Sequence, residues 1–470
     1  MNSTLAIRAI PVLLALAASA LLAQWVLSTP APFEIVPRLP GQDGRDQAAL
    51  ANRPPVNIEG KLVKGEGKPA DWPGSWPRFR GADFTNVSRE AVPLLRQLDR
   101  PLPKLWEIQT AEGYAGAIVH RGRVYFLDYD VPAQADVLRC ISLADGREIW
   151  RRAYEVEIGR NHGITRTTAA ATDTHVVSLG PKCHVLCVDA DTGAFKWGID
   201  LAREYKSTVP PWYAGQCPLI DGDRAILAPA GPEALMIAVD LETGTVVWKT
   251  PNPRAWQMTH SSIIPMEFAG RRMYLYCGSG GVVGVSADDG SILWDTTEWR
   301  VTMANVPSPI PIGDGRIFLS GGYGAGAMML RLTVVDGRIV PQVEYRLPAK
   351  VFGAEQQTPV LYNGFIYGLV PSDGQLVCLS LDGQRMWASG RQHRFGLGPL
   401  MIADGMVIAV NDAGQMSLVE ATDRDFVLLG QTTLFEDGHE AWGPLALAGG
   451  RLIARDMTRM ACFDLRRGGQ

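Results

Sequence analysis

Short runs of alternating apolar and polar residues recur along most of this chain, and many of them are followed by a glycine-containing turn. One unit ends at residues 188–197, where the turn Asp-x-x-Thr-Gly precedes a strand that carries Trp197. The full pattern returns at residues 239–248, and a turn with glycine followed by tryptophan returns at residues 141–150 and 285–294. A one-residue-shorter form stands at residues 379–387. Alternation with a period of two predicts β-strands, and repetition of one unit along the chain predicts a repeat architecture.

A second set of positions gives the number of units independently. Each unit begins with a small residue that lies shortly before a strand. These eight residues are Gly116, Thr168, Cys217, Ser262, Ser308, Thr358, Gly398 and Gly443. Units of about 47 residues with four short strands each are typical of propeller blades. The sequence therefore predicts an all-β fold, an eight-bladed β-propeller of four-stranded antiparallel blades.

The two ends of the repeat region complement each other. The eighth unit stops after its third strand, whereas Trp106 stands before the first unit at a position where a fourth strand would end. We expect residues 104–110 to supply the outer strand of the last blade, because closing the ring removes an exposed strand edge.

The repeated tryptophans and most cysteines are interpreted as structural. A tryptophan at this place can pack flat between blades, provided that its indole N–H finds an acceptor. The structural tryptophans are Trp106, Trp150, Trp197, Trp248, Trp294 and Trp387. Five of the seven cysteines (Cys140, Cys187, Cys217, Cys378 and Cys462) fall in repeat columns as small packing residues, and one long-range disulfide stays open.

The N-terminal residues precede the repeats and differ from them. Residues 9–26 are almost wholly apolar, with Arg8 before them, which predicts a hydrophobic helix in a signal peptide or membrane anchor over residues 1–28. Its charge asymmetry places the following chain outside the cytoplasm. We expect a propeller anchored in the membrane through residues 9–27 on the periplasmic side, or one secreted after signal cleavage. Residues 29–74, rich in proline and glycine, are expected to be a flexible linker before the propeller at 75–470.

Charge excludes one class of partner and leaves a candidate site at the axis. The net charge of −4 gives no electrostatic footprint for nucleic acid. Residues just before the small-residue column should line the mouth of the central channel. The candidate ligand-binding residues are Arg166, Gln216, His260, Asn305, Glu355, Gln357, Glu440 and Trp442. Asn305, Glu355 and Glu440 are the candidates for calcium, which prefers oxygen ligands. Polar residues are also the ordinary outcome in a wet channel mouth, so no catalytic residue is assigned, and His162 is interpreted as a solvated loop residue.

The repeat Asp-x-x-Thr-Gly-x-x-x-Trp resembles that of the pyrroloquinoline quinone (PQQ) propeller superfamily. The segment Trp76-Pro77-Arg78-Phe79-Arg80-Gly81 is similar to the lead-in of bacterial PQQ-binding-like propellers, and the resemblance covers about residues 75–470. It implies either a quinoprotein dehydrogenase, which holds PQQ and calcium at the axis, or a cofactor-free scaffold of the BamB type. Those dehydrogenases often carry a disulfide between adjacent cysteines, and this chain has no adjacent cysteines.

We therefore expect a non-catalytic extracytoplasmic scaffold, a monomeric propeller that presents its loops to protein partners in the cell envelope and needs no cofactor. The alternative is a dehydrogenase of alcohols or sugars that depends on PQQ and calcium.

Overall fold

The computed structural model describes residues 3–28, 55–98 and 100–468. Helix α1 (Ser3–Ser28) belongs to one compact unit of the chain, and the propeller forms the other. A helix is thus present where the sequence analysis expected one. In the described part of the chain, no helix combines the length and apolar character that a membrane crossing requires. Most of the expected linker, residues 29–54, lies outside the described residues.

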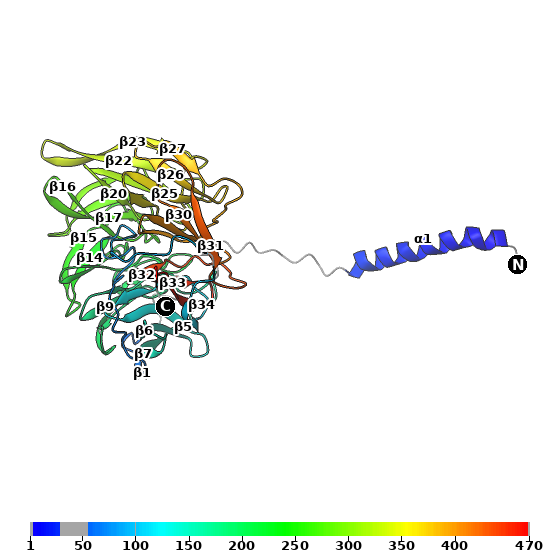
Figure 1. Ribbon diagram of the computed structural model, residues 1–470, viewed down its shortest axis with the longest axis horizontal. Helices are drawn as coiled ribbons and strands as arrows, with labels where there is room; N and C mark the ends of the chain where they lie inside the picture. The colour runs from blue at the N-terminus through cyan, green and yellow to red at the C-terminus, as the bar shows by residue number, and fades with distance from the viewer. Residues whose placement is uncertain (1–2, 29–54, 99, 469–470) are drawn as a thin grey trace. The chain divides into compact units, whose positions relative to one another are not determined.

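Within the described residues, eight antiparallel sheets form the blades, and their colours follow the chain around the molecule in Figure 1. The first four blades consist of β4 (Ile118–His120), β5 (Arg123–Asp130), β6 (Ala135–Ser142) and β7 (Glu148–Glu155); β8 (Ala170–Ala171), β9 (His175–Leu179), β10 (His184–Asp189) and β11 (Phe195–Asp200); β12 (Leu219–Asp221), β13 (Arg224–Leu227), β14 (Met236–Asp240) and β15 (Val246–Thr250); β16 (Ile264–Phe268), β17 (Arg271–Gly278), β18 (Gly281–Ser286) and β19 (Ile292–Thr296). A short helix, α3 (Leu201–Glu204), follows β11.

The last four blades continue in the same order. They consist of β20 (Ile310–Gly313), β21 (Arg316–Gly321), β22 (Gly326–Val335) and β23 (Arg338–Leu347); β24 (Val360–Tyr362), β25 (Phe365–Val370), β26 (Gln375–Ser380) and β27 (Arg385–Ala388); β28 (Leu400–Ala403), β29 (Met406–Val410), β30 (Gln415–Glu420) and β31 (Leu428–Thr433); β32 (Ala446–Ala448), β33 (Arg451–Arg455), β34 (Arg459–Asp464) and β3 (Lys104–Gln109). The first strands of neighbouring blades contact one another, as β4 does with β8, so they surround the central axis. The predicted eight-bladed propeller is confirmed.

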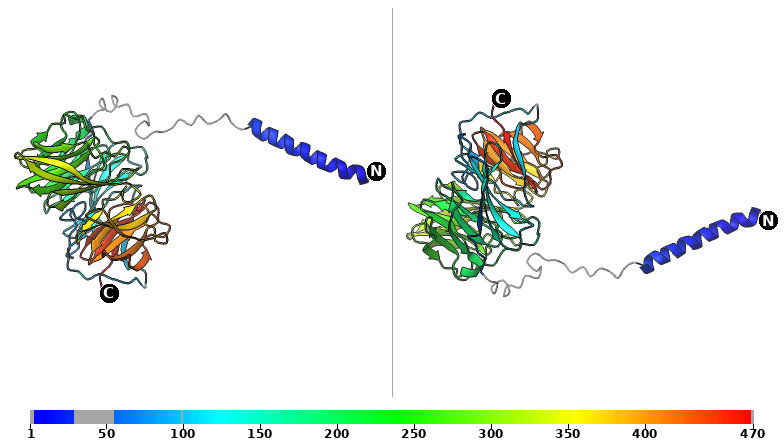
Figure 2. Two further views of the ribbon diagram at one scale, coloured as in Figure 1. Left: turned by 90° about the horizontal axis from the view of Figure 1, so that it is seen from above. Right: turned by 90° about the horizontal axis from the view of Figure 1, so that it is seen from below.

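The ring closes through strand β3, as predicted. β3 pairs antiparallel with β34 and is the outermost strand of the eighth blade. In both views of Figure 2 the C-terminal end lies beside the orange and red blades. Trp106 in β3 then reaches the first blade, where its indole N–H donates to the Leu143 carbonyl oxygen at 2.8 Å. One strand from the N-terminal side thus joins the last blade to the first.

Repeated tryptophans pack against the turn glycines of the next blade. Gly193 has a φ of +71°, and a Cβ at this position would lie 2.6 Å from the Trp150 ring of the preceding blade. Gly244 stands in the same relation to Trp197, whose indole N–H donates to the Leu241 carbonyl at 2.8 Å. The turn therefore needs glycine for two reasons, its left-handed backbone and the close approach of the indole. All seven cysteines are buried and free, so the long-range disulfide left open by the sequence is absent.

Part of the expected flexible linker is ordered on the propeller. Strand β1 (Lys61–Lys64) pairs antiparallel with β7 and adds a fifth strand to the first blade. Ile58, just before it, is buried. The flexible-linker prediction is wrong for this stretch, because the open edge of β7 offers backbone donors and acceptors to any extended segment that reaches it.

Candidate functional site: the axial cavity

A series of hydrogen bonds links five of the small residues that begin the blades. The backbone N–H of Thr168 donates to Cys217 Sγ at 3.2 Å, and that of Cys217 donates to Ser262 Oγ at 3.0 Å. Ser262 N–H continues to Ser308 Oγ at 3.1 Å, and Ser308 N–H to Thr358 Oγ1 at 2.9 Å. At four of the eight column positions a short side chain thus supplies an acceptor atom bonded to its Cβ. These bonds tie blades two to six together at the axis.

One end of the channel is crossed by residues 76–88, which we call the plug segment. Trp76 pairs with Val119 in the first blade, and the Pro77 carbonyl accepts from Ala171 N–H in the second at 2.8 Å. Because Val119 and Ala171 belong to the innermost strands β4 and β8, the segment runs next to the axis.

The plug segment then reaches the opposite blades. Arg78 donates to the Ile220 carbonyl of the third blade at 3.0 Å, and Asn86 donates to the Leu400 carbonyl of the seventh at 2.6 Å. Strand β2 (Val87–Ser88) finally pairs in parallel with β28. Contacts with blades on both sides of the ring require the segment to pass across the channel.

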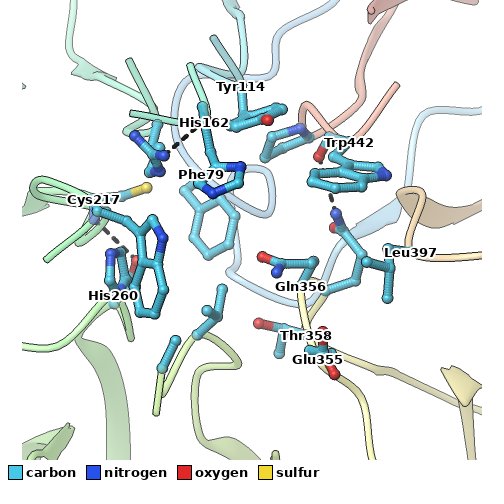
Figure 3. A pocket seen from close by; sticks show the side chains of 18 of the residues that line it. Phe79, Tyr114, His162, Cys217, His260, Glu355, Gln356, Thr358, Leu397 and Trp442 are labelled. Carbon is cyan, nitrogen blue, oxygen red and sulfur yellow. Dashed lines mark hydrogen bonds between the residues drawn. The ribbon is translucent and has the colours of Figure 1, made fainter. Parts of the chain in front are cut away.

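Arg80 fixes the centre of the plug segment. Its buried guanidinium donates to the carbonyls of Thr358 and Pro359 in the sixth blade, both at 3.1 Å, and to those of Phe84 and Thr85 within the segment. Burial lowers the pKa of Arg80 to about 9, which leaves the side chain cationic at neutral pH. Phe79, its neighbour, lines the space above the plug segment (Figure 3).

An axial cavity of about 360 Å³ opens over the plug segment, a volume in the range of small-ligand pockets. Aromatic side chains from separate parts of the chain line it, namely Phe79, Tyr114, Trp212, Tyr323 and Trp442. Figure 3 shows His260 and Trp442 on opposite sides of the cavity, with Phe79 between them. Loops of several blades thus meet around one open cavity.

Tyr114 and Trp442 form one wall. Their rings stack with centroids 5.3 Å apart and an interplanar angle of 25°. The Tyr114 hydroxyl donates to a Glu440 carboxylate oxygen, and burial together with this carboxylate raises the pKa of Tyr114. The Trp442 indole donates to Asp412 at 2.7 Å, and the Gln357 amide donates to the Trp442 carbonyl at 3.0 Å. These three hydrogen bonds therefore connect the parts of the wall to one another.

Arg166 fixes the loop that precedes it and packs on Tyr114. Its guanidinium lies over the Tyr114 ring, 5.5 Å from the centroid. It donates to the carbonyls of Asn161 and His162 at 2.9 and 2.8 Å, and more distantly to the next two carbonyls of the same loop. This loop brings His162 to the cavity with a left-handed φ of +48° and an exposed side chain. The predicted solvated loop histidine is therefore also part of the lining.

His260 and Trp212 lie on the other side. Their ring centroids are 6.4 Å apart. Burial and the positive charge of Arg166 lower the pKa of His260 to about 3, so its imidazole is neutral at neutral pH. Its Nε2 is buried without a hydrogen-bond partner among the described residues. This wall consequently carries no charge.

Five of the eight candidate ligand-binding residues predicted from the sequence line the cavity, and three do not. Arg166, His260, Glu355, Gln357 and Trp442 line it. Gln216 is buried behind it, where its amide oxygen accepts from Ala228 N–H at 2.9 Å and its amide nitrogen donates to the Ala228 carbonyl. Asn305 is buried, and its backbone carbonyl accepts from the His260 backbone N–H at 3.1 Å, while its side-chain Oδ1 has no partner among the described residues. The Glu440 carboxylate accepts from the Tyr114 hydroxyl.

The expected calcium ligands do not converge. Of Asn305, Glu355 and Glu440, only Glu355 lines the cavity, and its Oε2 accepts from the Tyr323 backbone N–H at 3.4 Å. Among residues 3–28, 55–98 and 100–468, no group of three His, Cys, Asp or Glu side chains is arranged to hold a metal ion. These three residues therefore do not fit the calcium site that the sequence analysis considered.

Several lining residues were missed because they do not occupy a repeat position. Phe79 comes from the plug segment, and its only signal was the distinctive motif at residues 76–81. Trp212, Met303, Tyr323 and Leu397 stand in loops between repeat elements. Nonrepeating aromatic residues close to the small-residue column are the signal that could have found Trp212.

Comparisons with known proteins agree with this architecture. The model of the family described as outer membrane protein assembly factor BamB matches residues 133–389, more than half of the chain. No curated protein sequence is significantly similar to the whole chain or a part of it.

Two solved structures share the fold at low identity, and a third is similar with a lower score. Quinohemoprotein alcohol dehydrogenase from Comamonas testosteroni has a TM-score of 0.58 at 12% identity, over 84% of this chain and 81% of that one. The computationally designed Ika8 protein has a TM-score of 0.50 at 12% identity, over 77% and 99% of the two chains. BamB from Moraxella catarrhalis has a TM-score of 0.49 at 15% identity, over 77% and 99%. The repeat, the eight blades and the matched residues 133–389 together show that this chain, a PQQ-like β-propeller repeat protein, belongs to the family of outer membrane protein assembly factor BamB.

Proposed function

We propose that the protein is a non-catalytic scaffold outside the cytoplasm, which presents the loops around its axial cavity to a protein partner in the cell envelope. The observation that carries the proposal is the apolar rim of the cavity. Met303 is 57% exposed and Tyr323 is 38% exposed, and both line the cavity. Exposed aromatic and methionine side chains beside a pocket are typical of protein interfaces.

The polar residues of the mouth support presentation of rigid loops. Arg166, Glu440 and Gln357 all bond to neighbouring loop groups, as described above, and so hold the rim in one shape. A rim ordered before binding loses less conformational entropy when a partner arrives. Membership in a family described as an outer membrane assembly factor supports a partner in the envelope. Export and tethering through the N-terminal helix, and a monomeric propeller, are parts of the same proposal.

Site-specific photocrosslinking in the native envelope tests the proposal. A photoreactive amino acid replaces Met303 in the full-length protein, and a matched control carries it at Val246, an exposed residue of outer strand β15. We expect a discrete protein adduct from position 303 that is absent from position 246. Equal adducts at both positions, or none at 303, would overturn the docking role.

A second measurement tests whether the protein lacks dehydrogenase activity. Purified protein is supplied with PQQ and calcium, and oxidation of alcohols and sugars is followed with a coupled dye. We expect neither turnover nor a calcium-dependent rise in the melting temperature. Turnover that requires both additions would replace the scaffold with the dehydrogenase alternative.

A further inference from the structure

The axial cavity is closed at its base. The plug segment passes beneath it, held by Arg80 to the sixth blade and by Arg78 to the third. Phe79 of this segment forms part of the lining. A group that enters from the loop side therefore meets an apolar base and cannot pass through the ring.

The walls suit a flat group. Trp442, which is stacked on Tyr114, lies across the open space from His260 in Figure 3. Aromatic rings gain stabilisation from offset or edge-to-face contact with other rings, beyond the area that they bury. The volume of about 360 Å³ lies at the lower end of the range of ligand pockets and is sufficient for one large side chain.

The charges of the lining favour an uncharged occupant. Arg166 and Glu355 have opposite signs, and both are already bonded to backbone groups. His260 is neutral, as its depressed pKa indicates. Because the positive Arg166 and the negative Glu355 offset each other, the lining favours neither sign of charge, and a charged group would still lose its hydration here.

The lining also offers oxygen acceptors. Glu355 and Gln356 reach the cavity from one loop. An aromatic group with an N–H or O–H donor therefore matches the lining better than a plain hydrocarbon ring. Tryptophan and tyrosine are the side chains with this combination.

The rim continues into the cavity without a break, since Met303 and Tyr323 belong to both. Tyr323 stands in the tight turn between β21 and β22, where it and Gly324 have φ values of +54° and +84° and Ala325 N–H donates to the Gly322 carbonyl at 3.0 Å. A partner loop that covers the rim can thus place a side chain in the cavity.

Resting on the proposed docking function, we propose that the axial cavity is a socket for one tryptophan or tyrosine side chain of the protein partner. The occupant is an uncharged aromatic group that carries a hydrogen-bond donor and stands at the tip of a partner loop.

Binding of a model side chain is the first test. N-acetyl-L-tryptophanamide is the probe, N-acetyl-L-alaninamide the control, and binding to the full-length protein is followed by ligand-observed NMR. Val306→Trp fills the cavity from its partly buried lining position, and Val246→Trp is the matched change on an outer strand. We expect Val306→Trp to weaken binding of the tryptophan probe at least about tenfold, and Val246→Trp to leave it unchanged.

Equal binding of the alanine probe, or unchanged affinity in Val306→Trp, would overturn the socket. Leu397→Trp fills the cavity from a different loop. It replaces Val306→Trp in the binding test if the melting temperature shows that Val306→Trp does not fold. Both filled variants should behave alike.

Crosslinking separates the socket from the docking function on which it rests. We expect Val306→Trp to remove the partner adduct at position 303 as well as probe binding. An adduct that survives with a filled cavity keeps the docking function and overturns the socket. Probe binding without any adduct at position 303 means that the cavity takes a free aromatic molecule. That result overturns both the socket for a partner side chain and the docking function.

Discussion

Asp136 shows how one buried residue contributes to the pH dependence of the stability of this propeller. It is buried in β6, and the Tyr154 hydroxyl donates to its Oδ2, while Oδ1 has no partner among the described residues. Burial raises the pKa of Asp136 to about 7, and the hydrogen bond from Tyr154 offsets only part of that rise. Because the pKa of an unfolded aspartate is about 3.9, the folded state binds more protons between these two values. Stability from this group is therefore present at low pH and is lost as the pH rises from about 4 to about 7.

Asp136→Asn should remove this dependence, since the amide stays neutral and can still accept from Tyr154. We expect the variant to gain stability relative to the parent between pH 5 and pH 8, by on the order of 3 kcal/mol. Urea unfolding at both pH values measures the difference. A constant difference between variant and parent across this range would contradict the assignment.

At the scale of single residues, the sequence predicted where the cavity lies better than it predicted which residues line it. Positions before the small-residue column do lead to the cavity, and His260 and Trp442 follow that rule. Gln216 obeys the same spacing yet turns into the protein, where its amide satisfies the backbone N–H and carbonyl of Ala228. Asn305 is also buried away from the cavity. Such choices depend on which loop group lies within hydrogen-bond distance, and spacing along the chain carries no information about that.

At the scale of elements, the stability of the plug segment can be tested by comparing a buried arginine with an exposed one. Arg80 donates four hydrogen bonds to carbonyls from a buried position, whereas Arg89 at the end of the same region makes an exposed ion pair with Asp83. Arg80→Ala should cost about 3 kcal/mol or more, because several buried carbonyls lose their donor. Arg89→Ala should cost less than about 1 kcal/mol.

Chemical denaturation gives both values, and proteolysis locates the effect. We expect Arg80→Ala to make residues 76–88 susceptible to cleavage while the blades stay resistant. Equal losses for the two arginine variants would show that the plug segment does not depend on Arg80.

The elements themselves were predictable to different degrees. The blades follow from turns such as that at Gly193 and from strands that alternate, both of which are local properties. Strand β1 was not predictable, because its four residues owe their conformation to the open edge of β7 and not to a pattern of their own. The plug segment stood out as a motif, but its path depends on blades far away in the chain, such as the sixth through Thr358.

For the molecule as a whole, the seam between the last and first blades is the point where the ring can open. Trp106 bridges it through the hydrogen bond to Leu143 and through packing on Gly146. Trp248 fills the corresponding place between two internal blades, against Gly290. Trp106→Ala and Trp248→Ala should each cost about 4 kcal/mol, since both leave a large cavity between blades.

The two variants should nevertheless differ in where they loosen, because only the seam is closed by a strand from the other end of the chain. In Trp106→Ala, β3 can leave β34 without breaking a covalent connection between neighbouring blades, and both strands lose protection. In Trp248→Ala the third and fourth blades remain joined by the chain itself, which limits their separation. Amide hydrogen exchange resolved by peptide measures this: we expect faster exchange at 104–109 and 459–464 in Trp106→Ala alone. The same pattern in both variants would mean that the ring opens as one cooperative unit, with no weak point at its seam.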